Sequence, residues 1–148
     1  MPVPDNSFDY AIIRVVPDVE RGECVNAGII LFCRTAGFLG VRIGLDTGRL
    51  LALAPAIDLP EVERELAHLV RVADGDPAAG PIARLSRSER FHWLVAPRST
   101  VIQPSAVHTG LCDDPRAALE RLVTSLVTLP AASGTDGRRE RLPSRPDA

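Results

Sequence analysis

Lysine is absent from this sequence of 148 residues, in which all 17 basic residues are arginine. Without a side-chain ammonium group the chain has no lysine to form a Schiff base, and it lacks the phosphate-binding lysine of P-loop and kinase sites. Aromatic residues are scarce, at 4%, so the core must consist mainly of aliphatic side chains. Any acid–base chemistry would have to come from carboxylates, histidines, cysteines or the single tyrosine.

Long apolar runs are also missing. The longest covers residues 27–33, whereas a membrane span needs about 20 residues. Residues 1–10 have neither the basic nor the apolar region of a signal peptide, so we expect a cytoplasmic protein. Three cysteines fit a reducing compartment better than a disulfide framework. A formal net charge of −2 argues against nucleic acid as the partner, since nucleic-acid binding needs a basic face.

The N-terminal third has the pattern of three consecutive β-strands. Residues 10–16 are β-branched and apolar on both faces, which is typical of a central strand. A polar loop separates them from a second apolar segment, residues 24–34, and a turn at Gly37 leads into a third, residues 38–43. These segments predict a three-stranded antiparallel meander.

Capping signals predict four helices in the rest of the chain. They begin after Asp46, Asp58, Ser86 and Asp114. Residues 100–103 and 105–109 predict two short strands, or one strand interrupted by Pro104, which belongs at an edge because proline cannot donate to a ladder. We therefore predict an α+β fold, with an antiparallel sheet of four or five strands packed by about four helices.

The predicted domain covers residues 1–130. Residues 131–148 contain four arginines and only one apolar side chain larger than alanine, Leu142. Such a segment cannot bury enough surface to offset its ordering entropy, so we predict a disordered tail.

The loop between the first two strands carries Asp18, Glu20 and Glu23. Its carboxylates could hold Mg²⁺ or serve as an acid–base pair, but the alternative, a solvated turn, is the one that composition favours. Arg14, inside an apolar strand, must be paired or reach solvent. We expect a structural ion pair with Asp18 or Glu23, with a substrate clamp as the alternative.

Hydrogen-bonding groups also gather in residues 98–110, where Arg98, Gln103, His108 and Thr109 flank the proline-bent edge. Arginine with hydroxyl groups can bind an anion or a phosphate. The alternatives are a polar edge strand that resists pairing and an edge that accepts a partner chain. The histidines show no metal-ligand spacing, so we expect neither a metal nor a cofactor.

Two segments carry a family pattern. The first follows Arg-x-x-Pro-Asp-x-x-Arg-Gly-Glu-x-x-Asn-x-Gly, and the second contains Ala-Pro-Arg at residues 96–98 and Val-His-Thr-Gly at residues 107–110. The residues that match the first pattern are Arg14, Pro17, Asp18, Arg21, Gly22, Glu23, Asn26 and Gly28. Over residues 10–129 the sequence resembles the small bacterial family called domain of unknown function 3037.

The resemblance implies no activity, because none is established for the family. It does imply a partner, since such proteins tend to be encoded beside a protein with a HipA-like kinase domain. It also draws attention to the motif residues Arg14, Asp18, Arg21, Glu23 and Asn26 as candidate binding residues.

Two hypotheses result. The first is a non-catalytic binding module that docks on a partner protein, such as the HipA-like kinase-domain protein, through the first loop and residues 98–110. The alternative is a small enzyme for a phosphorylated or nucleotide-like substrate. In that enzyme Asp18 and Glu23 bind metal or act as acid and base, while Arg98 and His108 hold the anion. The enzyme hypothesis requires all four side chains to converge in one pocket.

Overall fold

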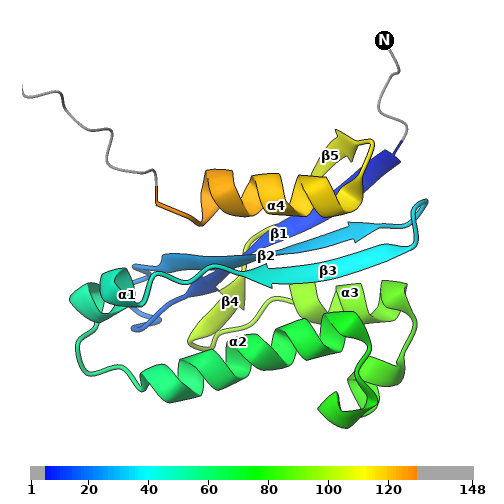
Figure 1. Cartoon of the computed structure of the whole chain (residues 1–148). Coiled ribbons are helices and arrows are strands. Elements are labelled where there is room, and N and C mark those ends of the chain that lie inside the picture. The colour runs from blue at the N-terminus through cyan, green and yellow to red at the C-terminus, as the bar shows by residue number, and fades with distance from the viewer. Residues whose placement is uncertain (1–5, 130–148) are drawn as a thin grey trace, which may run out of the picture.

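Residues 6–129, the part of the chain described by the computed structural model, build one five-stranded antiparallel sheet (Figure 1). Its strands are β1 (Asn6–Val15), β2 (Val25–Cys33), β3 (Phe38–Ile43), β4 (Ile102–Pro104) and β5 (His108–Cys112). The order is β3-β2-β1-β4, and β5 also pairs with β1. The predicted meander and the central position of β1 are therefore confirmed.

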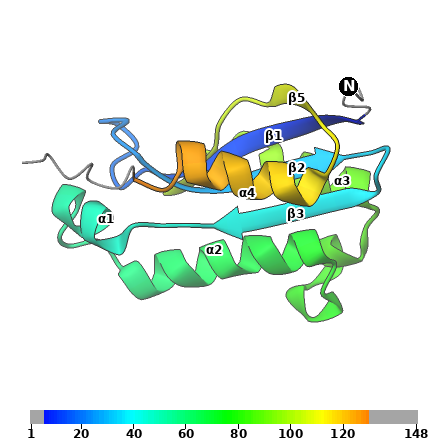
Figure 2. The ribbon, with the colours of Figure 1, turned by 45° about the horizontal axis from the view of Figure 1, so that its top comes forward.

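Four α-helices cover the sheet: α1 (Thr47–Leu53), α2 (Leu59–Asp74), α3 (Arg87–Val95) and α4 (Pro115–Leu126). Two short 3-10 turns, η1 (Pro77–Ala79) and η2 (Pro81–Arg84), connect α2 to α3. Figure 2 shows α4 on one face of the sheet and α2 with α3 on the other. The predicted α+β class is confirmed, and no helix within residues 6–129 is long and apolar enough to cross a membrane.

Each α-helix begins at its predicted cap, because a side chain there satisfies a first-turn amide that has no partner within the helix. The caps are Asp46, Asp58, Ser86 and Asp114. At Ser86 the capping box is complete, since Glu89 bonds back to the Ser86 amide. Helix α2 ends at Gly75, whose φ of 71° lies in the left-handed region that glycine adopts readily.

The core lies on both faces of the sheet. Ile13, Val15 and Ile30 pack on the side of α2 and α3, while Ile29 and Leu31 belong to the cluster on the side of α4. Because strand β2 is covered on both faces, it reads as a nearly continuous apolar run rather than an alternating one.

Strand boundaries differ most from the prediction at β1 and β5, while β4 is shifted by one or two residues from the predicted 100–103. Strand β1 begins at Asn6 because its polar start pairs with β5, a partner that the local sequence does not reveal. The predicted strand 105–109 lies instead at His108–Cys112, after a break at residues 105–107 that follows β4. The predicted boundary at residue 130 and the predicted disordered tail lie outside the described residues.

Candidate functional site

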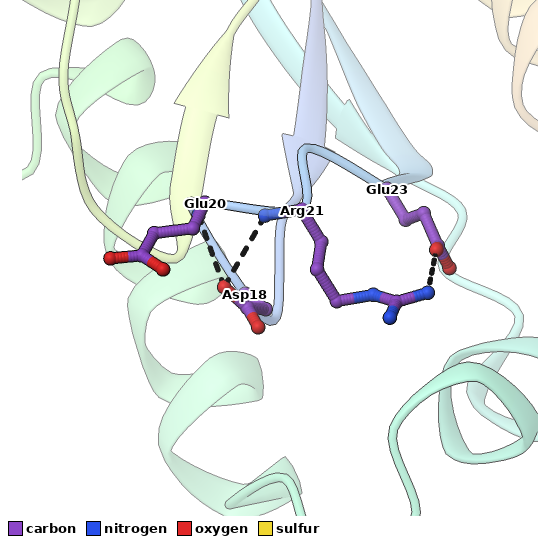
Figure 3. Close-up of polar contacts among 4 residues, drawn as sticks. All are labelled: Asp18, Glu20, Arg21 and Glu23. Atoms are coloured by element: carbon purple, nitrogen blue, oxygen red, sulfur yellow. Dashed lines mark hydrogen bonds and ion pairs between the residues drawn. The ribbon is translucent and has the colours of Figure 1, made fainter.

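Asp18 organises the loop between β1 and β2 (Figure 3). Its Oδ1 accepts hydrogen bonds from the backbone amides of Glu20 at 3.0 Å and Arg21 at 3.4 Å. Its carbonyl accepts from the amide of Gly22 at 3.1 Å, and Gly22 has a φ of 74°. Both residues therefore form the turn. The Asp18 carboxylate satisfies the backbone amides of the turn, and Gly22 adopts the positive φ angle that the turn requires.

Arg21 forms the ion pair of this loop, and its partner is Glu23. Both side chains are largely exposed, and the hydrogen bond from Arg21 to Glu23 raises the pKa of the guanidinium. We expected Asp18 or Glu23 to neutralise Arg14. That expectation is wrong, because Asp18 bonds within its own turn and Glu23 bonds to Arg21.

A cavity of about 360 Å³ lies beside this loop. On one side it is lined by Pro17, Asp18, Arg21 and Glu23, and on the other by residues 53–57, the last residue of α1 and the start of its connection to α2. Its size falls in the range of about 300–1,000 Å³ that is typical of ligand pockets. The three charged candidates of the loop therefore share one hollow, whose opposite wall is apolar.

Arg14 lies in a row with two other candidates. Its register partners are Asn26 on β2 and Gln103 on β4. The Asn26 amide donates to the carbonyl of Leu126 at 3.0 Å, which fastens the end of α4 to the sheet. The Arg14 Nε is buried without a hydrogen-bond partner, and the ion pairs between residues 6 and 129 do not include this guanidinium.

Arg98 belongs to a different surface. Its guanidinium stacks on Trp93, 4.5 Å from the ring centroid, and donates to the Trp93 carbonyl at 2.7 Å. Burial lowers the pKa of Arg98. The residue therefore closes the end of α3, and it also lines a second cavity of about 440 Å³ together with His68 and Thr100.

His108 and Thr109 both pair with β1, but as neighbours in a strand they point to opposite faces. The His108 ring lies 5.4 Å from that of Tyr10, which packs on the side of α4. The Thr109 hydroxyl donates to Asp9 at 3.1 Å. Both side chains have cross-strand partners that account for them structurally.

The arrangement separates the groups that the enzyme hypothesis needs in one pocket. Arg98 lies on the side of α3, whereas His108 lies on the side of α4. Asp18 and Glu23 line another cavity. A narrow hollow lined by Ile57 and neighbouring residues lies between that cavity and the one at Arg98. No three His, Cys, Asp or Glu side chains gather into a metal-binding group within residues 6–129.

Sequence reasoning missed the far wall of the loop cavity. Residues 53–57 read Leu-Ala-Pro-Ala-Ile, the end of α1 and an apolar connection toward α2. An apolar loop is an unusual composition for a solvated segment, and that was the available signal. The sequence could not show that residues 53–57 lie across the cavity from Arg21.

Comparison with known proteins points to one family. A family profile described as "Protein of unknown function (DUF3037)" matches residues 10–127, from within β1 to the residue that follows α4. Searches of curated proteins and of solved structures gave no match. The profile covers well over half of the chain and confirms the resemblance seen in its two motifs. The chain belongs to the DUF3037 family.

Proposed function

We propose that this chain is a non-catalytic binding module that docks on a partner protein through the cavity beside the β1–β2 loop. The observation that carries the proposal is the composition of that cavity, which has an apolar wall and a charged rim. Protein interfaces share this plan, with an apolar centre and polar groups around it. Exposed apolar side chains stand on both bordering segments, Val19 at 46% and Leu53 at 37%.

The bonds of the loop carboxylates support binding rather than catalysis. Asp18 is engaged by two backbone amides, and Glu23 is engaged by Arg21. A general acid or base must reach a substrate proton, and a metal site needs several free oxygen ligands. Asp18 instead holds the turn in shape, and Arg21 and Glu23 form an exposed pair of charges at the rim.

The family resemblance suggests a HipA-like kinase-domain protein as the partner. A matching surface on that protein would place an apolar side chain into the cavity. It would also set a carboxylate near Arg21 and a cation near Glu23, because complementary charges at a rim steer association and fix the register.

Co-expression with the HipA-like protein encoded beside this chain tests the proposal. We expect the wild-type protein to co-purify with it and the double variant Val19→Asp/Arg21→Glu to lose the partner. The matched control is Leu85→Asp/Arg84→Glu, which makes the same charge changes at a leucine that is 41% exposed and at an exposed arginine on η2.

Three outcomes would contradict the proposal. The wild-type protein fails to co-purify, both double variants lose the partner equally, or neither of them does. Thermal unfolding of both variants shows whether each is folded, so that loss of binding is not confused with loss of structure.

A further inference from the structure

The open edge of β3 lies at the bottom of a trough. Among residues 6–129, β3 pairs with β2 and with no other strand. Figures 1 and 2 both show β3 at the front of the sheet, with α4 on one side and α2 on the other. A hollow of about 550 Å³ follows this edge and is lined by residues 37–43, a stretch that includes the whole strand. Such a volume is within the range of about 300–1,000 Å³ found for ligand sites.

Backbone groups of β3 face this trough. The Gly44 amide donates to the carbonyl of Ala27 in β2 at 2.9 Å. Because antiparallel bonding alternates along a strand, Arg42 and Gly40 also turn their backbone groups toward β2. The amides and carbonyls of Leu39, Val41 and Ile43 therefore point away from β2. No proline interrupts the strand, so it presents a regular series of donors and acceptors.

The walls of the trough are basic. Arg116 of α4 lies over the Phe38 ring, 5.6 Å from its centroid, and Arg87 of α3 stands on the opposite wall. Both are exposed, and neither takes part in an ion pair with another described residue. Arg42 pairs with Glu120 at 3.0 Å, and the buried Arg90 donates to backbone carbonyls. Arg87 and Arg116 therefore supply the unpaired positive charge of the trough, against the single further carboxylate Asp74. This excess of positive charge occurs in a chain whose formal net charge is −2.

We propose that the β3 edge binds an extended, acidic segment of a partner protein, which adds to the sheet as a further strand. Strand addition needs an edge with alternating donors and acceptors, and this edge has them at Leu39, Val41 and Ile43. The phosphates of a nucleic-acid backbone offer acceptors alone, and that backbone does not have the alternating donors and acceptors of an extended peptide, which match the outward amides and carbonyls of β3. The unpaired Arg87 and Arg116 give the preference for acidic side chains.

Peptides of defined charge test the proposal directly. The probes are an alternating Val–Glu peptide as long as β3 and a Val–Lys peptide of the same length, each titrated into ¹⁵N-labelled protein. We expect the Val–Glu peptide to shift the amide resonances of Leu39, Val41 and Ile43, and the Val–Lys peptide to leave them in place. Shifts that map instead to β5, or that are equal for both peptides, overturn the proposal.

Charge-reversal variants provide the second measurement. Arg87→Glu/Arg116→Glu should weaken binding of the Val–Glu peptide roughly tenfold, since two attractive contacts become repulsive. The matched control Arg49→Glu/Arg121→Glu carries the same net charge and changes two exposed arginines that do not line the trough. An equal loss in both double variants would show that only the overall charge matters, and would overturn the proposal.

Two other occupants would also overturn it. If the same amide shifts grow with protein concentration in the absence of peptide, a second copy of this chain occupies the edge. If a single-stranded oligonucleotide displaces the Val–Glu peptide and produces those shifts, the trough is a nucleic-acid site.

This surface is separate from the loop cavity, so the two proposals fail separately. If the Val19→Asp/Arg21→Glu variant still binds the Val–Glu peptide, the trough functions independently of docking at the loop. If the wild-type protein co-purifies with the HipA-like protein but does not bind the Val–Glu peptide, only the trough inference is lost.

Discussion

At one edge of the sheet, β4 carries its own protection against pairing, whereas at the opposite edge β3 carries none. Pro104 has no amide to donate, and the Thr100 hydroxyl donates to the carbonyl of Ile102 at 2.9 Å. That carbonyl faces away from β1, because the bonds between the strands are made by Val101 and Ser105 on either side. Strand β3 has no proline, and its outward carbonyls face an open trough.

The difference shows where a partner strand can be accommodated. Exposed edge strands promote unwanted association, and proteins protect them with proline, charge or covering segments. The sequence predicted that residues 98–110 form a contact edge. Within that stretch, however, the edge of β4 is blocked by Pro104 and by the Thr100 hydroxyl. Strand β3 is an edge without this protection, and it contains none of the matched motif residues.

Near each edge an arginine donates hydrogen bonds to backbone carbonyls at the end of a helix. Replacing these two arginines should give the largest losses in the free energy of unfolding. Arg90 is buried and donates to the carbonyls of Val72, Ala73 and Leu85. Arg90→Met should lower the free energy of unfolding by about 3 kcal/mol, because buried acceptors are left without donors. Arg98 serves one carbonyl, so Arg98→Met should cost about 1 kcal/mol. Urea denaturation measures both, and equal losses would remove this contrast between the edges.

A glycine beneath a phenylalanine ring occurs near each edge, and the two should respond differently to alanine. A Cβ on Gly110 would lie 2.5 Å from the ring of Phe8, which is buried, and one on Gly40 would lie 2.8 Å from the ring of Phe38, which is half-buried. We expect Gly110→Ala to cost about 2 kcal/mol and Gly40→Ala less than about 1 kcal/mol, because Phe38 has room to move. If Gly40→Ala is the more costly substitution in thermal unfolding, the β3 edge is packed more rigidly than its exposure implies.

Thr100→Val tests the protection of the β4 edge. The variant keeps the shape of the side chain and removes the donor to Ile102, so we expect a loss of about 0.5 kcal/mol. We also expect the blocked edge to become partly accessible, which amide hydrogen exchange along β4 would detect as faster exchange. Unchanged exchange would mean that Pro104 by itself closes this edge.

The smallest effect concerns the turn that follows α2, below the β3 trough. The Ala78 amide and the Arg71 guanidinium lower the pKa of Asp76. A carboxyl whose pKa is lower in the folded state adds stability above the unfolded pKa of about 3.9. That stability is lost as the pH falls through the folded pKa. Asp76→Asn should therefore be less stable than wild type at neutral pH, and the gap should narrow in acid. A gap that stays constant with pH would exclude an ionised Asp76 as its cause.

Local signals in the sequence were enough for much of the fold. The four caps, Asp46, Asp58, Ser86 and Asp114, each mark the start of an α-helix because capping depends on residues within one turn. The meander was likewise predictable, since apolar alternation and short loops determine neighbouring strands. The starts of β1 and β5 were not predictable, because each depends on pairing with the other across most of the chain.

The candidate residues show the same contrast between local features, which the sequence predicts, and features that depend on the folded structure. The roles of Asp18 and Gly22 in their turn follow from the sequence, since both act over a few residues. The absence of an ion pair at Arg14 within residues 6–129 did not follow, because the competing pair between Arg21 and Glu23 depends on side-chain directions in the folded loop.

The sequence by itself determined that the chain has no lysine chemistry, that its basic side chains other than histidine are all arginine, and that its four α-helices and the strands β2 and β3 begin near their signals. These are properties of composition and of contacts within a turn or a hairpin. Only the tertiary structure decided that Arg98 and His108 lie on opposite faces, that residues 53–57 face the loop, and that β3 lies between basic walls. Those facts depend on segments that are distant in sequence and meet when both faces of the sheet are buried. The burial of apolar surface that brings them together is non-directional, so it leaves no fixed spacing in the sequence from which the contacts could be predicted.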